Sequence, residues 1–148
     1  MIQIQLVEHE DLLNLIDLFD AYRIFYRQES DKLAAKSFWE ARFEARDFIA
    51  YIAKNDAEVV GFVNCYFQLS SVRMEPYILL NDLFVVPSFR NQGIGKMLLD
   101  QVKVYAHEND YFGIQLETEA NNQEGNYLYP KEGFKRVLNN FYFWLVQD

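Results

Sequence analysis

The segment with the most chemical content joins an apolar stretch to an amphipathic one through a proline and two glycines. Residues 81–86 have the character of a buried strand, Pro87 ends it, and apolar side chains recur at helical spacing after Gly93. Glycines between a strand and a helix let the backbone approach a ligand, and the first helical turn leaves its N–H groups without partners. These N–H groups and the helix dipole favour an anion. The segment therefore predicts a phosphate-binding turn.

Spacing separates three kinds of phosphate-binding turn. A P-loop requires Gly-x-x-x-x-Gly-Lys-Ser/Thr, but Gly95-Lys96 is followed by Met97, and Arg90 occupies the position of the first glycine. A dinucleotide-binding fingerprint requires a third glycine where this chain has Leu98. The pattern Arg/Gln-x-x-Gly-x-Gly/Ala fits at every fixed position, as Arg90-Asn91-Gln92-Gly93-Ile94-Gly95. This segment resembles the acetyl-coenzyme A signature of the GNAT superfamily of N-acyltransferases.

A second motif follows about one helix later. Residues 114–118 indicate a short strand, after which the GNAT pattern is Asn-x-x-Ala-x-x-Leu-Tyr-x-x-x-Gly-Phe. The matching residues are Asn122, Leu128, Tyr129, Gly133 and Phe134, with Gly125 where alanine is usual. Two motifs in the expected order make the resemblance specific over residues 81–134. Residues 1–80 carry the expected element order without a sharp motif.

The periodicity of the whole chain predicts one domain, residues 1–148, with an α/β fold. The expected order is a strand, two helices, three strands, a helix, a strand, a short helix and one or two final strands. The ranges are 2–7, 10–28, 32–46, 48–53, 59–69, 77–86, about 94–109, 114–118 and, for the last strand, 140–146. This is the order of the GNAT fold, which implies a mixed central sheet of about six to seven strands with helices on both faces.

Acetyl transfer from a thioester to an amine requires removal of an amine proton, stabilisation of an oxyanion and a proton for the departing thiolate. The resemblance implies that Tyr129 is the general acid, although a tyrosine there also suits a core position. Glu117 is one candidate base, because it resembles the glutamate of the branch that acetylates protein N-termini. Asp82 is the other, because a carboxylate between Leu80 and Phe84 is partly withdrawn from water. For both carboxylates the alternative is a solvated surface charge.

The resemblance also implies acetyl-CoA as cosubstrate and no metal. Backbone groups of Leu83, Phe84 and Val85 would hold the thioester end. The remaining cofactor-binding residues would be Arg90, Asn91, Gln92, Gly93, Ile94, Gly95, Lys96 and Asn122. Direct transfer needs no protein nucleophile, and Cys65, on an apolar strand face, is expected to pack in the core.

Amino-acid composition limits the classes of partner that we expect this protein to bind. The formal charge is −8, from 22 acidic and 14 basic residues, so the surface repels nucleic acid and attracts cations. We expect a small cationic, polyamine-like amine as acceptor. A protein N-terminus or lysine, or a non-catalytic acyl-CoA-binding module, are the alternatives. The chain shows neither a signal-peptide pattern nor an apolar run of the roughly 18 residues that a membrane span needs, which predicts a cytoplasmic protein.

The C-terminal tail has apolar side chains on both faces of its predicted strand, in the run Phe141-Tyr142-Phe143-Trp144-Leu145-Val146. A strand that covers one core needs a single apolar face, and an exposed strand edge invites pairing with another chain. The tail therefore predicts a homodimer, unless the second helix covers the extra face within one chain.

Overall fold

The computed structural model describes residues 1–147, which divide into two compact units. The first unit comprises Met1–Glu117, and the second begins at Thr118. No helix among the described residues is both long and apolar enough to cross a membrane.

The first unit follows the predicted order of elements. These are β1 (Ile2–Leu6), the 3₁₀ turn η1 (His9–Asp11), α1 (Leu12–Phe25), α2 (Lys32–Ala45), β2 (Phe48–Asn55), β3 (Glu58–Ser70), β4 (Glu75–Val85), the 3₁₀ turn η2 (Pro87–Phe89), α3 (Ile94–Glu108) and β5 (Ile114–Leu116). Local chemistry fixes several boundaries. The side chain of Asp31 accepts a hydrogen bond from Ala34 N at the start of α2, and Pro87 ends the ladder of β4.

The five strands form one mixed sheet in the order β1-β2-β3-β4-β5. The first three junctions are antiparallel and the β4–β5 junction is parallel. The expectation of a mixed sheet is confirmed, but six to seven strands is too many, because the described residues after β5 add no strand to it. β4 lies between β3 and β5, as its apolar character on both faces predicts.

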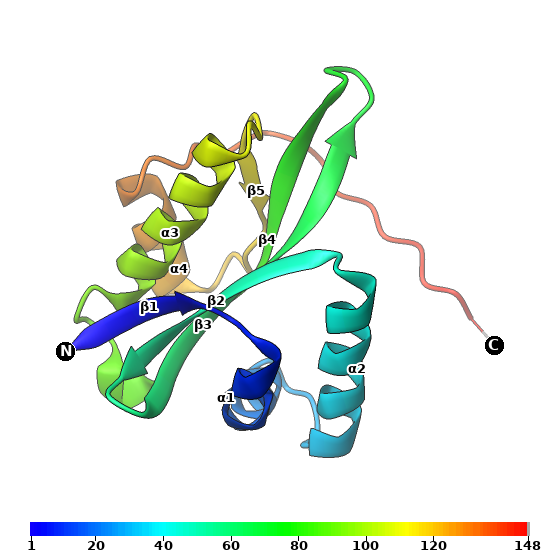
Figure 1. Cartoon of the computed structure of the whole chain (residues 1–148). Helices are drawn as coiled ribbons and strands as arrows, with labels where there is room; N and C mark the ends of the chain where they lie inside the picture. The colour runs from blue at the N-terminus through cyan, green and yellow to red at the C-terminus, as the bar shows by residue number, and fades with distance from the viewer. Residues whose placement is uncertain (148) are drawn as a thin grey trace. The chain divides into compact units, whose positions relative to one another are not determined.

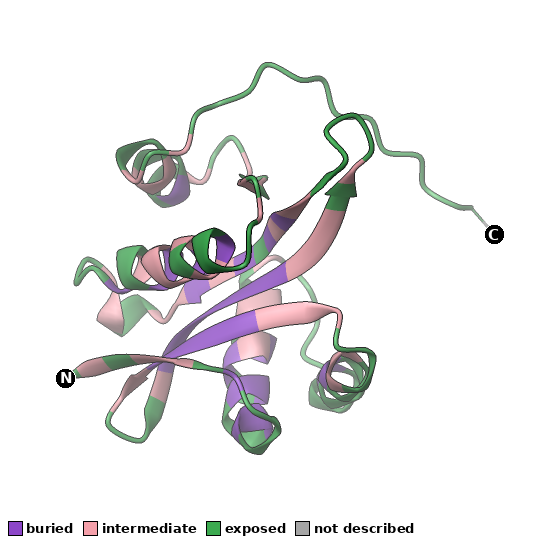
Figure 2. Cartoon of the chain, turned by 45° about the horizontal axis from the view of Figure 1, so that its top comes forward, coloured by how far each residue is buried: buried purple, intermediate pink, exposed green. Residues whose placement is uncertain are grey.

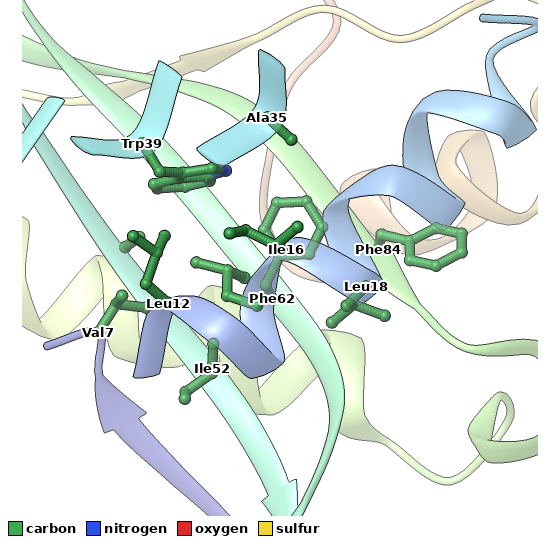
Figure 3. Packing of buried hydrophobic residues seen from close by; sticks show 11 residues of the cluster. Val7, Leu12, Ile16, Leu18, Ala35, Trp39, Ile52, Phe62 and Phe84 are labelled. Carbon is green, nitrogen blue, oxygen red and sulfur yellow. The ribbon is translucent and has the colours of Figure 1, made fainter. Parts of the chain in front are cut away.

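Helices cover both faces of the sheet in the first unit (Figure 1). On one face, Trp39 of α2 and Ile16 of α1 converge on Phe62 of β3, and all three side chains are buried (Figure 3). On the opposite face α3 begins against Gly61, where an added Cβ would lie 3.1 Å from the carbonyl oxygen of Phe84. A larger residue here would press on the β4 backbone, and its Cβ would lie 3.5 Å from Ile94 Cγ2 of α3, so the absence of a side chain suits this close packing.

Burial is concentrated in the middle of the sheet. The central parts of β2, β3 and β4 are buried, whereas the tip of the β3–β4 hairpin is exposed (Figure 2). Burial of each large apolar side chain contributes roughly 1.5–3 kcal/mol, so the sheet centre is the stable frame on which the site is built.

The second unit contains α4 (Gln123–Lys131), which carries the predicted motif tyrosine. Residues 135–147 form no strand, and the side chains of Phe141–Val146 are 67–87% exposed. The prediction of a last strand over residues 140–146 is therefore wrong for the single chain. A strand needs a neighbour for its N–H and C=O groups, and the described part of the second unit contains no other strand.

Candidate active site

The phosphate-binding turn predicted from the glycines lies between η2 and α3. Arg90 is extended, Asn91 has φ 60° and Gly93 has φ 81°. Gly93 is the N-cap of α3, and its carbonyl accepts the helical hydrogen bond from Met97 N at 3.0 Å. A left-handed conformation disfavours residues with a Cβ, so the requirement for glycine at this position is conformational.

The start of α3 suits an anion. Among the described residues no side chain caps its N-terminus, and its first turn contains no acidic residue. A Cβ added at Gly93 would meet no atom within 4 Å, so the space beside the turn is open. The N–H groups of the first turn can therefore be satisfied by a phosphate, as the binding of coenzyme A requires.

Arg90 ties this turn to the end of β4. Its Nε donates a 2.8 Å hydrogen bond to the carbonyl of Val85, and its guanidinium lies 5.4 Å from the ring centroid of Phe84 and 5.6 Å from that of Phe25. Lys96 forms an exposed 2.7 Å ion pair with Asp100, one turn along α3. Such a surface pair contributes little to stability. The two cations therefore differ: Arg90 shapes the turn, while Lys96 places positive charge on the helix surface.

On the N-terminal side of the turn, β4 separates from β5. Their parallel pairing ends at Leu80 and Leu116, whereas β4 continues to Val85 with β3 on its other edge. Leu83, Phe84 and Val85 are thus held by β3 alone within the sheet. The sequence analysis expects backbone groups of these three residues to hold the thioester end of the cofactor, and this stays a prediction.

A β-bulge lies at the point where the two strands separate. Asn64 of β3 pairs with Asp82, and the next residue, Cys65, pairs with Leu80, so Asn81 is the extra residue on β4. The bulge places Asp82 on the sheet face that carries Phe62, which α1 and α2 cover. The candidate base therefore lies where the strands begin to diverge.

The carboxylate of Asp82 is buried and hydrogen-bonded. Its Oδ2 accepts from Asn64 Nδ2 at 3.0 Å and from Asn81 Nδ2 at 3.2 Å. Asn64 Nδ2 also donates to the hydroxyl of Tyr66 at 3.0 Å. Sequence reasoning identified Asp82 but missed these partners. A signal was present, because Asn64 interrupts an otherwise apolar buried run in β3.

The second candidate base, Glu117, directly follows β5 and is exposed. In register it lies one residue past the last β4–β5 pair. The structure thus places both candidate carboxylates at the end of the same strand pairing, one buried and one in solvent.

Cys65 is fully buried, and this burial raises the pKa of its thiol. The expectation that Cys65 packs in the core is therefore confirmed. Burial first, and then the Asp82 carboxylate, also raise the pKa of the Tyr66 hydroxyl. Both groups are protonated near neutral pH.

The second unit contains the other two predicted site residues. Asn122 caps α4: its Oδ1 accepts from Gly125 N at 3.2 Å, and its Nδ2 donates to Thr118 Oγ1 at 2.8 Å. A Cβ on Gly125 would lie 2.6 Å from Asn122 Nδ2 and 3.1 Å from Tyr129 Cε2, which explains why glycine replaces the usual alanine. Tyr129 is helical although Pro130 follows it, and its ring packs edge-on against Phe134 at 5.9 Å.

The model of the Acetyltransferase (GNAT) family matches residues 14–134. The chain belongs to this family. It is 40% identical over 125 residues to the uncharacterised N-acetyltransferase YhfO of Bacillus subtilis, and the aligned region covers 84% of each chain. It is 28% identical to a probable acetyltransferase of Haemophilus influenzae, over 80% of this chain and 85% of that protein. This GNAT protein is thus an acetyl-CoA-dependent acetyltransferase.

Solved structures share the fold. The crystal structure of a probable acetyltransferase superimposes with a TM-score of 0.92 at 28% identity, over 99% of both chains. The aminoglycoside N-acetyltransferase AAC(6')-Iy, in complex with a bisubstrate analogue of coenzyme A, superimposes with a TM-score of 0.86 at 19% identity, over 99% of both chains. The GNAT fold expected from the two motifs is confirmed.

Proposed function

We propose that this GNAT enzyme transfers the acetyl group of acetyl-CoA directly to a small cationic primary amine in the cytoplasm. The observation that carries the proposal is the continuity of β4 and α3. One segment supplies a buried carboxylate at Asp82, the strand edge at residues 83–85 and the open helix start at Gly93. A base, a site for the thioester and a site for the pyrophosphate thus follow one another along the chain.

In the proposed reaction Asp82 accepts a proton from the bound ammonium group. The amine nitrogen then forms a bond to the thioester carbonyl carbon, and the carbon–sulfur bond breaks. The hydroxyl of Tyr129 gives its proton to the departing thiolate and is reprotonated from solvent, while the nitrogen loses its second proton to solvent as the amide forms. Backbone N–H groups of β4 stabilise the oxygen that gains negative charge. A positioned acid or base contributes about 10²–10⁴-fold to such a reaction.

We favour Asp82 over Glu117 as the base because a buried, hydrogen-bonded carboxylate is better fixed than an exposed one. Asp82→Asn and Glu117→Gln test the choice. The true base, when replaced, should lower kcat by about 10²–10⁴-fold and remove the acidic limb of the pH–rate profile. The other variant should retain both within a few-fold.

Two lines of support concern the acceptor. The net charge of −8 attracts cationic amines, and similar folds occur in aminoglycoside N-acetyltransferases. The second candidate function is acetylation of a protein N-terminus, because a ribosomal-protein-alanine N-acetyltransferase also has this fold, with a TM-score of 0.78 at 21% identity.

Release of free thiol from acetyl-CoA tests the proposed function. Spermidine, an aminoglycoside, a peptide with a free N-terminus and an N-terminally blocked peptide with one lysine form a discriminating panel. Turnover with the first two supports the proposal, and turnover with a peptide alone supports the second function. Binding of acetyl-CoA without thiol release for any amine would indicate a non-catalytic module.

A further inference from the structure

Two asparagine side chains donate hydrogen bonds to the same oxygen of Asp82. Asn64 Nδ2 and Asn81 Nδ2 both donate to Oδ2, at 3.0 and 3.2 Å. Among residues 1–147 no hydrogen bond engages Oδ1. The two oxygens of the carboxylate are therefore inequivalent, since one is held by the sheet and the other is left for a ligand.

The orientation of Asn64 is fixed by two acceptors. Its Nδ2 donates one hydrogen to Asp82 and the other to the hydroxyl of Tyr66, at 3.0 Å each. Reversing the amide would place Oδ1 against the carboxylate, which two acceptors do not tolerate. The cross-strand pairing of Asn64 with Asp82, created by the bulge at Asn81, sets this contact.

A purely structural role does not account for Asn64. Its side chain is completely buried, and its Oδ1 has no hydrogen-bond partner among the described residues. An unpartnered buried carbonyl is unfavourable, and an apolar side chain in β3 would avoid the loss. The amide is therefore better explained by what its NH₂ group does for Asp82.

We propose that Asn64 and Asn81 are positioning residues that hold Oδ2 of Asp82, so that Oδ1 faces the acceptor amine and takes its proton. The proposal rests on the proposed function, in which Asp82 is the base. We call this pair of asparagines the clamp.

The other titratable groups that interact with Asp82 come from β3. They are the Cys65 thiol and the Tyr66 hydroxyl, and burial raises the pKa of each. Both are uncharged near neutral pH, so neither adds a charge beside the Asp82 carboxylate that would obscure the effect of the two amides on it. Glu117, the carboxylate that follows β5, is exposed.

The clamp is tested first in the protein without ligands, by the ¹³C chemical shift of the Asp82 carboxyl carbon near neutral pH, assigned with Asp82→Asn. Asn81→Ala alters an exposed side chain and is expected to leave the fold intact, and Asn14→Ala, on the exposed face of α1, is its matched control. Asn64→Ala removes the buried donor. We expect this chemical shift to change in Asn81→Ala and in Asn64→Ala, because each variant removes a donor to Oδ2, with no change in Asn14→Ala.

The second readout is kinetic. In amine acetylation, kcat should fall about tenfold in Asn64→Ala while the KM for acetyl-CoA is unchanged. An unchanged Asp82 carboxyl chemical shift in Asn81→Ala overturns the clamp, even if Asn64→Ala does not fold. If the chemical shift changes but Asp82→Asn keeps full turnover, Asp82 is not the base, and the positioning role is overturned while the thiol-release test of acetyltransferase activity still stands.

Discussion

Ser30 and Asp20 are joined across the turn between α1 and α2 by a 2.6 Å hydrogen bond from Ser30 Oγ to Asp20 Oδ2. The backbone N–H of Asp31 donates to the other carboxylate oxygen at 2.8 Å, and Asp20 itself is buried. The turn that these bonds fix precedes α2. A buried carboxylate thus organises the entry to that helix.

The hydroxyl of Ser30 first, and then the N–H of Asp31, lower the pKa of Asp20 below its usual value of about 3.8. Because the folded-state pKa is the lower one, the stabilisation is fully present above the unfolded value and is lost as the pH falls through the folded value. Asp20→Asn should therefore destabilise the protein by about 1–3 kcal/mol at pH 7. Urea unfolding should show this difference shrinking below pH 4. Ser71→Ala, at an exposed serine, is the control, and an undiminished difference at low pH would contradict the assignment.

Gly93→Ala should weaken acetyl-CoA binding, because alanine disfavours the φ of 81° that aims the first N–H groups of α3. The strain should cost about 1–2 kcal/mol of stability. Acetyl-CoA at 100 times its Kd should raise the Tm of the unmutated protein by a few degrees, since it adds about 2.7 kcal/mol. Gly113→Ala is the matched control, because a Cβ there also meets no atom within 4 Å and no positive φ is required. Equal acetyl-CoA-induced shifts in the two variants would rule out the turn as the binding site.

Tyr129→Phe should lower kcat by about 10²–10⁴-fold if its hydroxyl protonates the thiolate, with acetyl-CoA binding nearly unchanged. Tyr127→Phe is the natural comparison, since Tyr127 lies on the same helix, is 71% exposed and differs in place but not in chemistry. Steady-state kinetics with a reactive amine measure both. A near-normal kcat for Tyr129→Phe would make that tyrosine a packing residue.

The exposed tail should pair with a second copy of the chain. Trp144 is 81% exposed, whereas Trp39 is fully buried, so burial of the tail would shift tryptophan emission to shorter wavelength as the protein concentration rises. Light scattering at micromolar concentration should give about twice 17.6 kDa. Deletion of residues 140–148 should return the monomer mass and abolish the emission shift. A full-length mass near 17.6 kDa would refute the dimer.

Much of the first unit was predictable because hydrophobic periodicity and end signals agree there. The helix after Gly93 was expected to end near Asn109, where the structure ends it with the Asn109 side chain bonded to the Tyr105 carbonyl. Periodicity locates the edge of a buried face less well. Met97, an apolar residue of this helix, is 37% exposed, whereas Leu99 lies in the core.

The bulge at Asn81 could not be predicted. Residues 77–86 are largely apolar on both faces, so an inserted residue leaves no mark in the alternation of the strand. Yet the bulge decides that Asp82 faces Asn64, and with it the hydrogen bonds of the candidate base. The two motifs identified the helix starts, but the surroundings of the carboxylate depend on pairing between strands.

The prediction of a strand in the C-terminal tail was wrong for a different reason. Its residues favour strands by type, but a strand forms only when a neighbour supplies hydrogen-bond partners, and residues 135–147 have none of these in a ladder. Composition indicated an apolar surface that needs cover, and it could not identify what covers it.

The unequal pairing of β4 makes the two sides of the proposed site differ in stiffness. On the β3 side, the ladder runs the length of a long hairpin from Gly61–Val85 to Ser70–Glu75. On the β5 side, only Ile78, Leu79 and Leu80 are paired. Short, sparsely bonded edges open at lower free energy than long ladders. The β3 side of β4 is therefore the fixed side and the β5 side the yielding one. In the proposed site, where residues 83–85 hold the thioester, the pantetheine arm would enter and leave past β5 without unfolding the sheet.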